Sequence, residues 1–171
     1  MPADKSDRFP ILMLECGVKA LSLRKAQDAI RSKYGPHYHC HDEAMWEVAA
    51  DLWGITPKRP PINRHGVFEL FDDIVGLRAG RYEIIVKIAV APNGLCAMSK
   101  SHRTALSGGC SPLSVWNPLA FFSLDDARTA GLAEHRKRFA DMIKLGCGDI
   151  SEAKAMLELI DDAATPQLEL F

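Results

Sequence analysis

The strongest constraint on the fold is residues 82–91, in which apolar side chains recur at every second position. This period of two is typical of a β-strand, because successive side chains point to opposite faces of a sheet. Pro92-Asn93-Gly94 then predicts a turn, and residues 95–104 predict a returning strand. The sequence therefore predicts an antiparallel β-hairpin near the centre of the chain.

Two helices are expected before this hairpin. Ser22 is a plausible N-cap for a helix that ends before Gly35-Pro36, because apolar residues follow it at helical spacing. Asp42 is a plausible N-cap for a second helix that runs toward Gly54. The connector that follows, residues 56–66, contains three prolines and cannot be regular structure.

Two further helices are expected after the hairpin. Ser123 begins a capping box for a helix that extends to about Leu145, with residues 134–138 as its charged outer face. Ser151 is expected to cap the last helix. Residues 67–75 predict a strand or short helix, and residues 107–112, which include Cys110 as the best candidate for a reactive thiol, predict a flexible loop.

These elements predict an α+β fold with a small antiparallel sheet, a central β-hairpin and flanking N- and C-terminal helices. A chain of 171 residues with 47% hydrophobic content can build one core, so we expect one globular domain over residues 1–162. Residues 163–171 are expected to form a flexible tail, because Pro166 cannot continue a helix.

Composition and charge restrict the cellular context. A net charge of −1 provides no general attraction to nucleic acid, so any association with DNA should be local or indirect, through a partner. Five cysteines without paired spacing are typical of reduced thiols. The polar N-terminal segment is followed only by a short apolar run, which predicts a cytoplasmic protein without a membrane association.

A cluster of histidines lies between the first two expected helices. If His37, His39 and His41 lie on an extended stretch, their period of two places the three imidazoles on one side, where they could bind zinc or another divalent metal. The first alternative function is therefore a metal-dependent hydrolase or nuclease. A polar entry to the following helix explains the same residues without a metal, and His65 and His102 would be distant fourth ligands.

Basic residues suggest a second alternative, a DNA-binding regulator. Exposed cations on a helix or loop can contact phosphates of the DNA backbone. The candidate contacts lie on the first helix and in the proline-containing connector: Arg24, Lys25, Lys58, Arg59 and Arg64. An ordinary solvated charged surface is the simpler explanation of the same residues.

The last five residues form the most specific motif, Gln167-Leu168-Glu169-Leu170-Phe171. An apolar peptide in a tail that should lie in water suggests a ligand for a pocket on another protein. The motif resembles the peptide with which bacterial replication and repair proteins bind the DNA polymerase sliding clamp, usually Gln-Leu-(Ser or Asp)-Leu-Phe. Glu169 departs mildly from that form.

The resemblance implies a role for each matching position. Gln167 would be the polar anchor, Leu168 and Leu170 would fill apolar pockets, and Phe171 would be the terminal aromatic group. The preferred hypothesis is therefore an accessory protein of DNA replication, DNA repair or a phage or other mobile element, which acts by binding the sliding clamp. The sequence identifies no catalytic residue, and the preferred hypothesis requires no cofactor.

Overall fold

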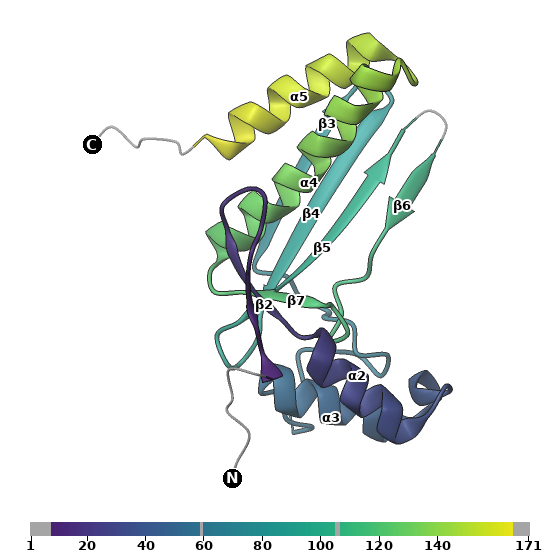
Figure 1. Ribbon diagram of the computed structural model, residues 1–171, viewed down its shortest axis with the longest axis vertical. Helices are drawn as coiled ribbons and strands as arrows, with labels where there is room; N and C mark the ends of the chain where they lie inside the picture. Colours follow the sequence, from purple (N-terminus) through teal and green to yellow (C-terminus); the bar gives the residue numbers. More distant parts are fainter. Residues whose placement is uncertain (1–7, 59, 105–106, 166–171) are drawn as a thin grey trace, which may run out of the picture.

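The computed structural model of the chain describes residues 8–58, 60–104 and 107–165 (Figure 1). It confirms the predicted α+β class, because strands of the described residues join in one antiparallel sheet against which α-helices pack. The sheet is larger than the small one expected. Three of its strands, near residues 11, 19 and 119, are too short to show a clear apolar period in the sequence.

The described strands form a seven-stranded sheet in the order β1-β2-β7-β5-β4-β3, and β6 pairs with the end of β5. Their bounds are β1 (Ile11–Met13), β2 (Lys19–Ser22), β3 (Asp73–Ala79), β4 (Tyr82–Val90), β5 (Cys96–Arg103), β6 (Gly108–Cys110) and β7 (Leu119–Phe121). The two halves of the sheet meet at a single residue pair, Cys96 with Phe121. The N-terminal β1–β2 hairpin thus joins the sheet through β7.

The predicted central hairpin is confirmed as β4 and β5. They pair antiparallel from Glu83 with Arg103 to Val90 with Cys96. The side chains of Ile84, Val86 and Ile88 are fully buried on one face, as their alternation predicts.

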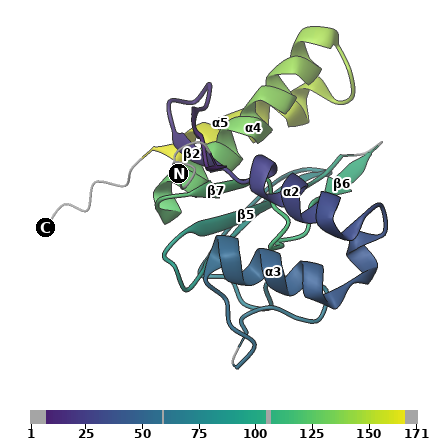
Figure 2. The same cartoon turned by 60° about the horizontal axis from the view of Figure 1, so that its bottom comes forward.

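α4 (Leu124–Leu145) and α5 (Ile150–Ala164) cover one face of the sheet, and α2 (Arg24–Tyr34) and α3 (Asp42–Trp53) pack against one end of the other face. A 3₁₀ turn, η1 (Tyr38–Cys40), precedes α3. Ile88 and Cys96 belong to the apolar cluster that includes Ala127 and Ala130 of α4. Ala89 and Ala97 point the other way and belong to the cluster with α2 and α3. Figure 2 shows α2 and α3 side by side, across the sheet from α4 and α5.

The helix ends confirm some predicted caps and correct others. α3 and α4 end at Gly54 and Gly146, both left-handed, as expected for helix C-termini. The hydroxyl oxygen of Ser123 accepts a hydrogen bond from the backbone N–H of Asp126, which confirms the predicted cap of α4. Ser22, by contrast, is the last residue of β2, because pairing with Leu119 of β7 holds it in the sheet. The N-cap of α2 is Leu23, without a side-chain bond.

Two further N-caps differ from the prediction. Asp42 lies inside α3, whose N-cap position is occupied by His41 without a side-chain hydrogen bond. Asp149, not Ser151, caps α5: its carboxylate accepts hydrogen bonds from the backbone N–H groups of Ser151 and Glu152. Asp is among the strongest N-cap residues, and the turn at Gly148 places it ahead of Ser151.

Three connecting segments also differ from their predicted structure. Residues 108–110 form β6 instead of a loop, because the backbone pairs with residues 101–103 of β5. The strand predicted within 67–75 begins only at Asp73, while Val67 and Phe68 form isolated bridges. α5 continues to Ala164 and so includes the first two residues of the predicted tail. None of the described helices is long and apolar enough to cross a membrane.

Candidate functional site

Helix α5, which precedes the predicted clamp-binding peptide, packs firmly on the sheet and on α4. Its residues Met156 and Ile160 are buried in an apolar cluster with Tyr82 of β4 and Phe139 of α4. The rings of Tyr82 and Phe139 lie 5.6 Å apart. Each fully buried side chain of this size contributes roughly 1.5–3 kcal/mol to folding, so the position of α5 is well determined.

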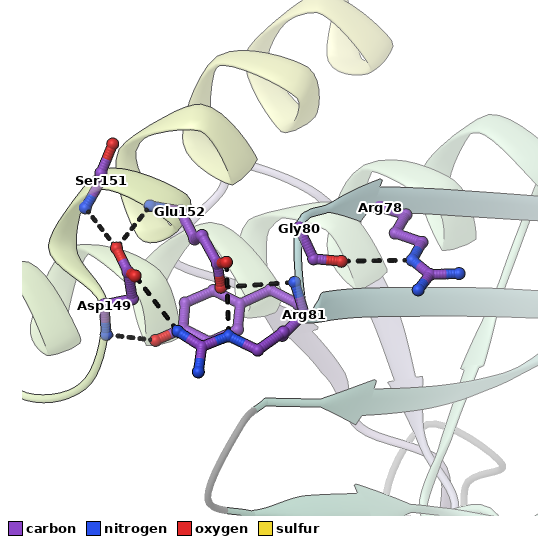
Figure 3. Close-up of polar contacts among 7 residues, drawn as sticks. Arg78, Gly80, Arg81, Asp149, Ser151 and Glu152 are labelled. Carbon is purple, nitrogen blue, oxygen red and sulfur yellow. Dashed lines mark hydrogen bonds and ion pairs between the residues drawn. The ribbon is translucent and has the colours of Figure 1, made fainter.

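Polar contacts hold the start of α5 against the β3–β4 turn, as shown in Figure 3. The Arg81 guanidinium forms ion pairs with Asp149 at 3.2 Å and Glu152 at 3.4 Å. The backbone N–H of Asp149 donates to the Tyr82 hydroxyl oxygen over 2.7 Å. Gly80 is required at the turn: its φ is +59°, and a Cβ there would lie 2.4 Å from a carboxylate oxygen of Glu152. The first turn of α5 and the turn between β3 and β4 are therefore complementary in both charge and shape.

The end of α5 lies at the protein surface. Asp161 pairs with Arg136 of α4 at 2.7 Å, and the Thr165 hydroxyl donates to the Asp161 carbonyl. Ile160 is buried, whereas Ala164 and Thr165 are exposed. The predicted peptide anchors Gln167, Leu168, Leu170 and Phe171, and Glu169 between them, lie outside the described residues.

The histidine run, residues 37–41, does not have the extended geometry required by the metal hypothesis. Tyr38–Cys40 form a 3₁₀ turn, which removes the period of two that would align the imidazoles. The side chains of His37, His39 and His41 are exposed, and the His37 and His39 ring centroids lie 6.2 Å apart. Across residues 8–58, 60–104 and 107–165, no three His, Cys, Asp or Glu side chains are placed to hold a metal ion. The geometric premise was therefore wrong.

Two members of the histidine run nevertheless meet a third histidine in the folded protein. The η1 pocket, a cavity of about 420 Å³, is lined in part by Tyr38, His39, His41, Arg64, His65 and Trp116. Tyr38 and Trp116 stack with ring centroids 5.0 Å apart, and the guanidinium of Arg31 lies 5.3 Å from each ring. His65, expected only as a distant ligand, thus lines the same cavity as His39 and His41, while His37 does not line it.

The predicted DNA contacts are distributed over two segments. Arg24 and Lys25 lie exposed in the first turn of α2, and Lys58 and Arg64 are exposed in the connector after α3. Arg59 lies outside the described residues. Arg64 donates a hydrogen bond to the Nε2 atom of His65, so it is held at the η1 pocket.

Sequence reasoning missed a second polar cavity, the α4 pocket. It has a volume of about 260 Å³ and lies between β5, β6 and α4, lined by Lys100, His102, Ser111, Glu134, His135 and Arg138, with Gly109 and Cys110 at β6. Residues 134–138 were predicted to form a charged outer face, but His135 is only 2% exposed. The prediction was wrong at this position because the helical turn that exposes Glu134 and Arg138 points His135 at the sheet.

The environment of the α4 pocket changes the protonation of its histidines. Burial, with smaller contributions from His102, Lys100 and Arg138, lowers the pKa of His135 to about 4. Burial and Arg138 also lower the pKa of His102. The same two causes lower the pKa of Lys100, which also forms an ion pair with Glu134. His135 is therefore a buried neutral imidazole beside charged groups.

Comparison of the chain with family models, curated proteins and solved structures finds no match.

Proposed function

We propose that this protein binds the bacterial DNA polymerase sliding clamp through Gln167–Phe171 and acts as an accessory protein of DNA replication or repair. The observation that carries the proposal is the match of Gln167, Leu168, Leu170 and Phe171 to the clamp-binding peptide. An accidental match at four defined positions is expected on the order of once in 10⁵ pentapeptides. In this proposal the protein acts by binding rather than by catalysis.

The position of α5 supports this proposal. The helix is fixed to the body at its start by Arg81 and Tyr82 and along its length by Met156 and Ile160. Its end at Ala164 and Thr165 is exposed. The peptide is therefore joined to the body at a point on the surface, and its attachment does not require α5 to leave the core.

The expected affinity is modest. Burial of Leu168, Leu170 and Phe171 in pockets of the clamp contributes roughly 1.5–3 kcal/mol each. Ordering a peptide on binding costs roughly 2–5 kcal/mol, in addition to the loss of translational freedom. Once hydrogen bonds from Gln167 and the backbone are included, the sum allows a Kd near micromolar, roughly −8 kcal/mol. Such an affinity suits reversible recruitment to a shared partner.

Binding of the purified full chain to a purified bacterial sliding clamp tests the proposal. We expect a Kd of about 1 μM for the full chain, and no measurable binding for a chain that ends at Thr165. Replacing both Leu170 and Phe171 by Ala should weaken binding about 100-fold or more, which corresponds to at least about 2.7 kcal/mol.

Glu169→Ala provides the matched control within the peptide, because Glu169 is the position at which the clamp-binding motif varies. It should keep an affinity close to that of the wild type. Circular dichroism melting of each variant establishes that the body is unchanged. Equal binding by the full chain and by the chain that ends at Thr165 would refute the proposed function.

A further inference from the structure

The α4 pocket contains a buried hydrogen-bonding atom that has no partner. The Nε2 atom of His135 is shielded from solvent and makes no hydrogen bond in the described part of the chain. The side chain lines the cavity and is 2% exposed. Burial of a polar atom without a partner costs roughly 1–3 kcal/mol. A ligand that forms a hydrogen bond to this atom would remove that cost, and the gain would contribute to its affinity.

Cations outnumber carboxylates in this pocket. Glu134 pairs with Lys100, which retains further ammonium N–H donors. Arg138 also lines the cavity, and among the described residues it has no carboxylate partner. The pocket therefore combines one unpaired guanidinium, one partly used ammonium and two imidazoles. All of these groups can donate hydrogen bonds to an anion.

The backbone of β6 is shaped to leave room for the imidazole of His102. A Cβ on Gly109 would lie 2.8 Å from the Cε1 atom of His102, closer than two carbon atoms can approach. His102 and His135 have their ring centroids 6.4 Å apart across the pocket. A residue larger than glycine at position 109 would force the His102 imidazole to move from its place in the pocket.

We propose that the α4 pocket binds a phosphate group. A phosphate presents three or more oxygens in different directions, which suits donors that converge from β5 and α4, and guanidinium binds it with two parallel hydrogen bonds. In the bound state Arg138 and Lys100 supply the positive charge, His102 contacts the anion from β5, and the neutral imidazole of His135 donates from the floor of the pocket. This inference is independent of the proposed clamp binding, because it does not involve residues 166–171.

The test is an NMR titration of the full-length protein with inorganic phosphate, at constant ionic strength maintained with sodium chloride. The resonances of the His135 ring, assigned by their loss in His135→Gln, should shift and saturate. A bound anion should also raise the pKa of His135. Arg138→Gln should weaken binding about tenfold or more, as expected for loss of a charged hydrogen-bond donor.

Arg136→Gln is the matched control, because it removes the same charge from the same helix at a side chain that does not line the pocket and pairs with Asp161 of α5. It should bind phosphate like the wild type. Gly109→Val is a second variant that narrows the pocket without changing its charge, and it should also weaken binding. Resonances that do not saturate, or equal affinities for Arg138→Gln and Arg136→Gln, would overturn the proposal.

Two further ligands identify the source of the phosphate. A mononucleotide that binds no more weakly than a short single-stranded oligonucleotide would indicate a small phosphate ester. An oligonucleotide that binds more tightly, with an affinity that falls steeply with salt, would indicate the backbone of a nucleic acid. Both results support a phosphate site and differ only in the molecule that carries the phosphate.

Discussion

The two histidine-containing cavities differ in how the chain builds them. The η1 pocket draws His39 and His41 from one contiguous run, and their side chains lie exposed around it. The α4 pocket combines His102 of β5 with His135 of α4, and His135 is 2% exposed. The cluster that is conspicuous in the sequence is therefore the more solvated one in the fold.

The difference shows that packing between a helix and a strand, and not the number of histidines in a run, determines which histidine is buried. Removal of water around His135 penalises its charged form, and its pKa falls to about 4. A helix and a strand must pack together to produce such an environment, and a short 3₁₀ turn at the surface does not. Three measurements test this contrast.

The largest effect is expected in the pH dependence of stability. His135 has a lowered pKa in the folded state, so its contribution is complete above the unfolded-state pKa of about 6.5. It is lost as the pH falls toward about 4, because the unfolded chain takes up the proton first. The wild type should lose about 3 kcal/mol of unfolding free energy over this range through His135. Urea denaturation at a series of pH values measures the loss.

His135→Gln should flatten this pH profile, since glutamine does not titrate. His39→Gln is the matched control and should retain most of the wild-type loss, because it leaves His135 in place. If the unfolding free energy of His135→Gln fell as steeply with pH as that of the wild type, the buried His135 would not be the cause of the loss.

An intermediate effect on the free energy of unfolding is expected when an aromatic side chain of the η1 pocket is removed. Trp116 is half-buried against Tyr38, at 5.0 Å between ring centroids, and beneath the guanidinium of Arg31. Trp116→Ala should lower the free energy of unfolding by about 2 kcal/mol, measured by urea denaturation followed by circular dichroism. Trp116→Phe keeps a ring against Tyr38 and should cost less than half as much. Equal losses for the two variants would show that the ring contact is unimportant.

The smallest effect is expected within the histidine run itself. His39→Ala and His41→Ala should each change the free energy of unfolding by no more than about 0.5 kcal/mol, since both side chains are exposed. His41 occupies the N-cap position of α3 without a side-chain bond, so its replacement removes no cap. Thermal melts at pH 7 measure both variants. A loss above about 1 kcal/mol for either would mean that the run supports the fold.

The elements that could be predicted are those specified by nearby residues. The β4–β5 hairpin follows from an alternation visible in one stretch of chain, and α3 and α4 end at glycines that adopt the left-handed conformation. The N-caps were misplaced by one or two residues where adjacent positions offered competing groups, as Asp149 and Ser151 do. Strands β1, β2, β6 and β7 were missed because each has only three or four residues, too few to show a period of two, and β2 and β7 also pair with each other across about 100 residues of chain.

The candidate sites divide in the same way. The peptide Gln167–Phe171 is a linear motif, so five adjacent residues are enough to suggest clamp binding. His102 and His135 carry no local signal that relates them, and Glu134–Arg138 resembles an ordinary charged helical face. Only the packing of α4 on β5 turns His135 toward the sheet and places Glu134 and Arg138 at the edge of the same cavity.

The amino-acid sequence by itself determined the α+β class, the central hairpin, the helix ends at Gly54 and Gly146 and the peptide motif, because alternation, glycine stops and linear motifs act over a few residues. The tertiary structure decided how β7 joins the two halves of the sheet, where α5 packs and which histidine is buried away from solvent. Those properties arise from contacts between residues far apart in the chain. Side-chain burial and strand pairing depend on contacts that form only when these distant segments pack together.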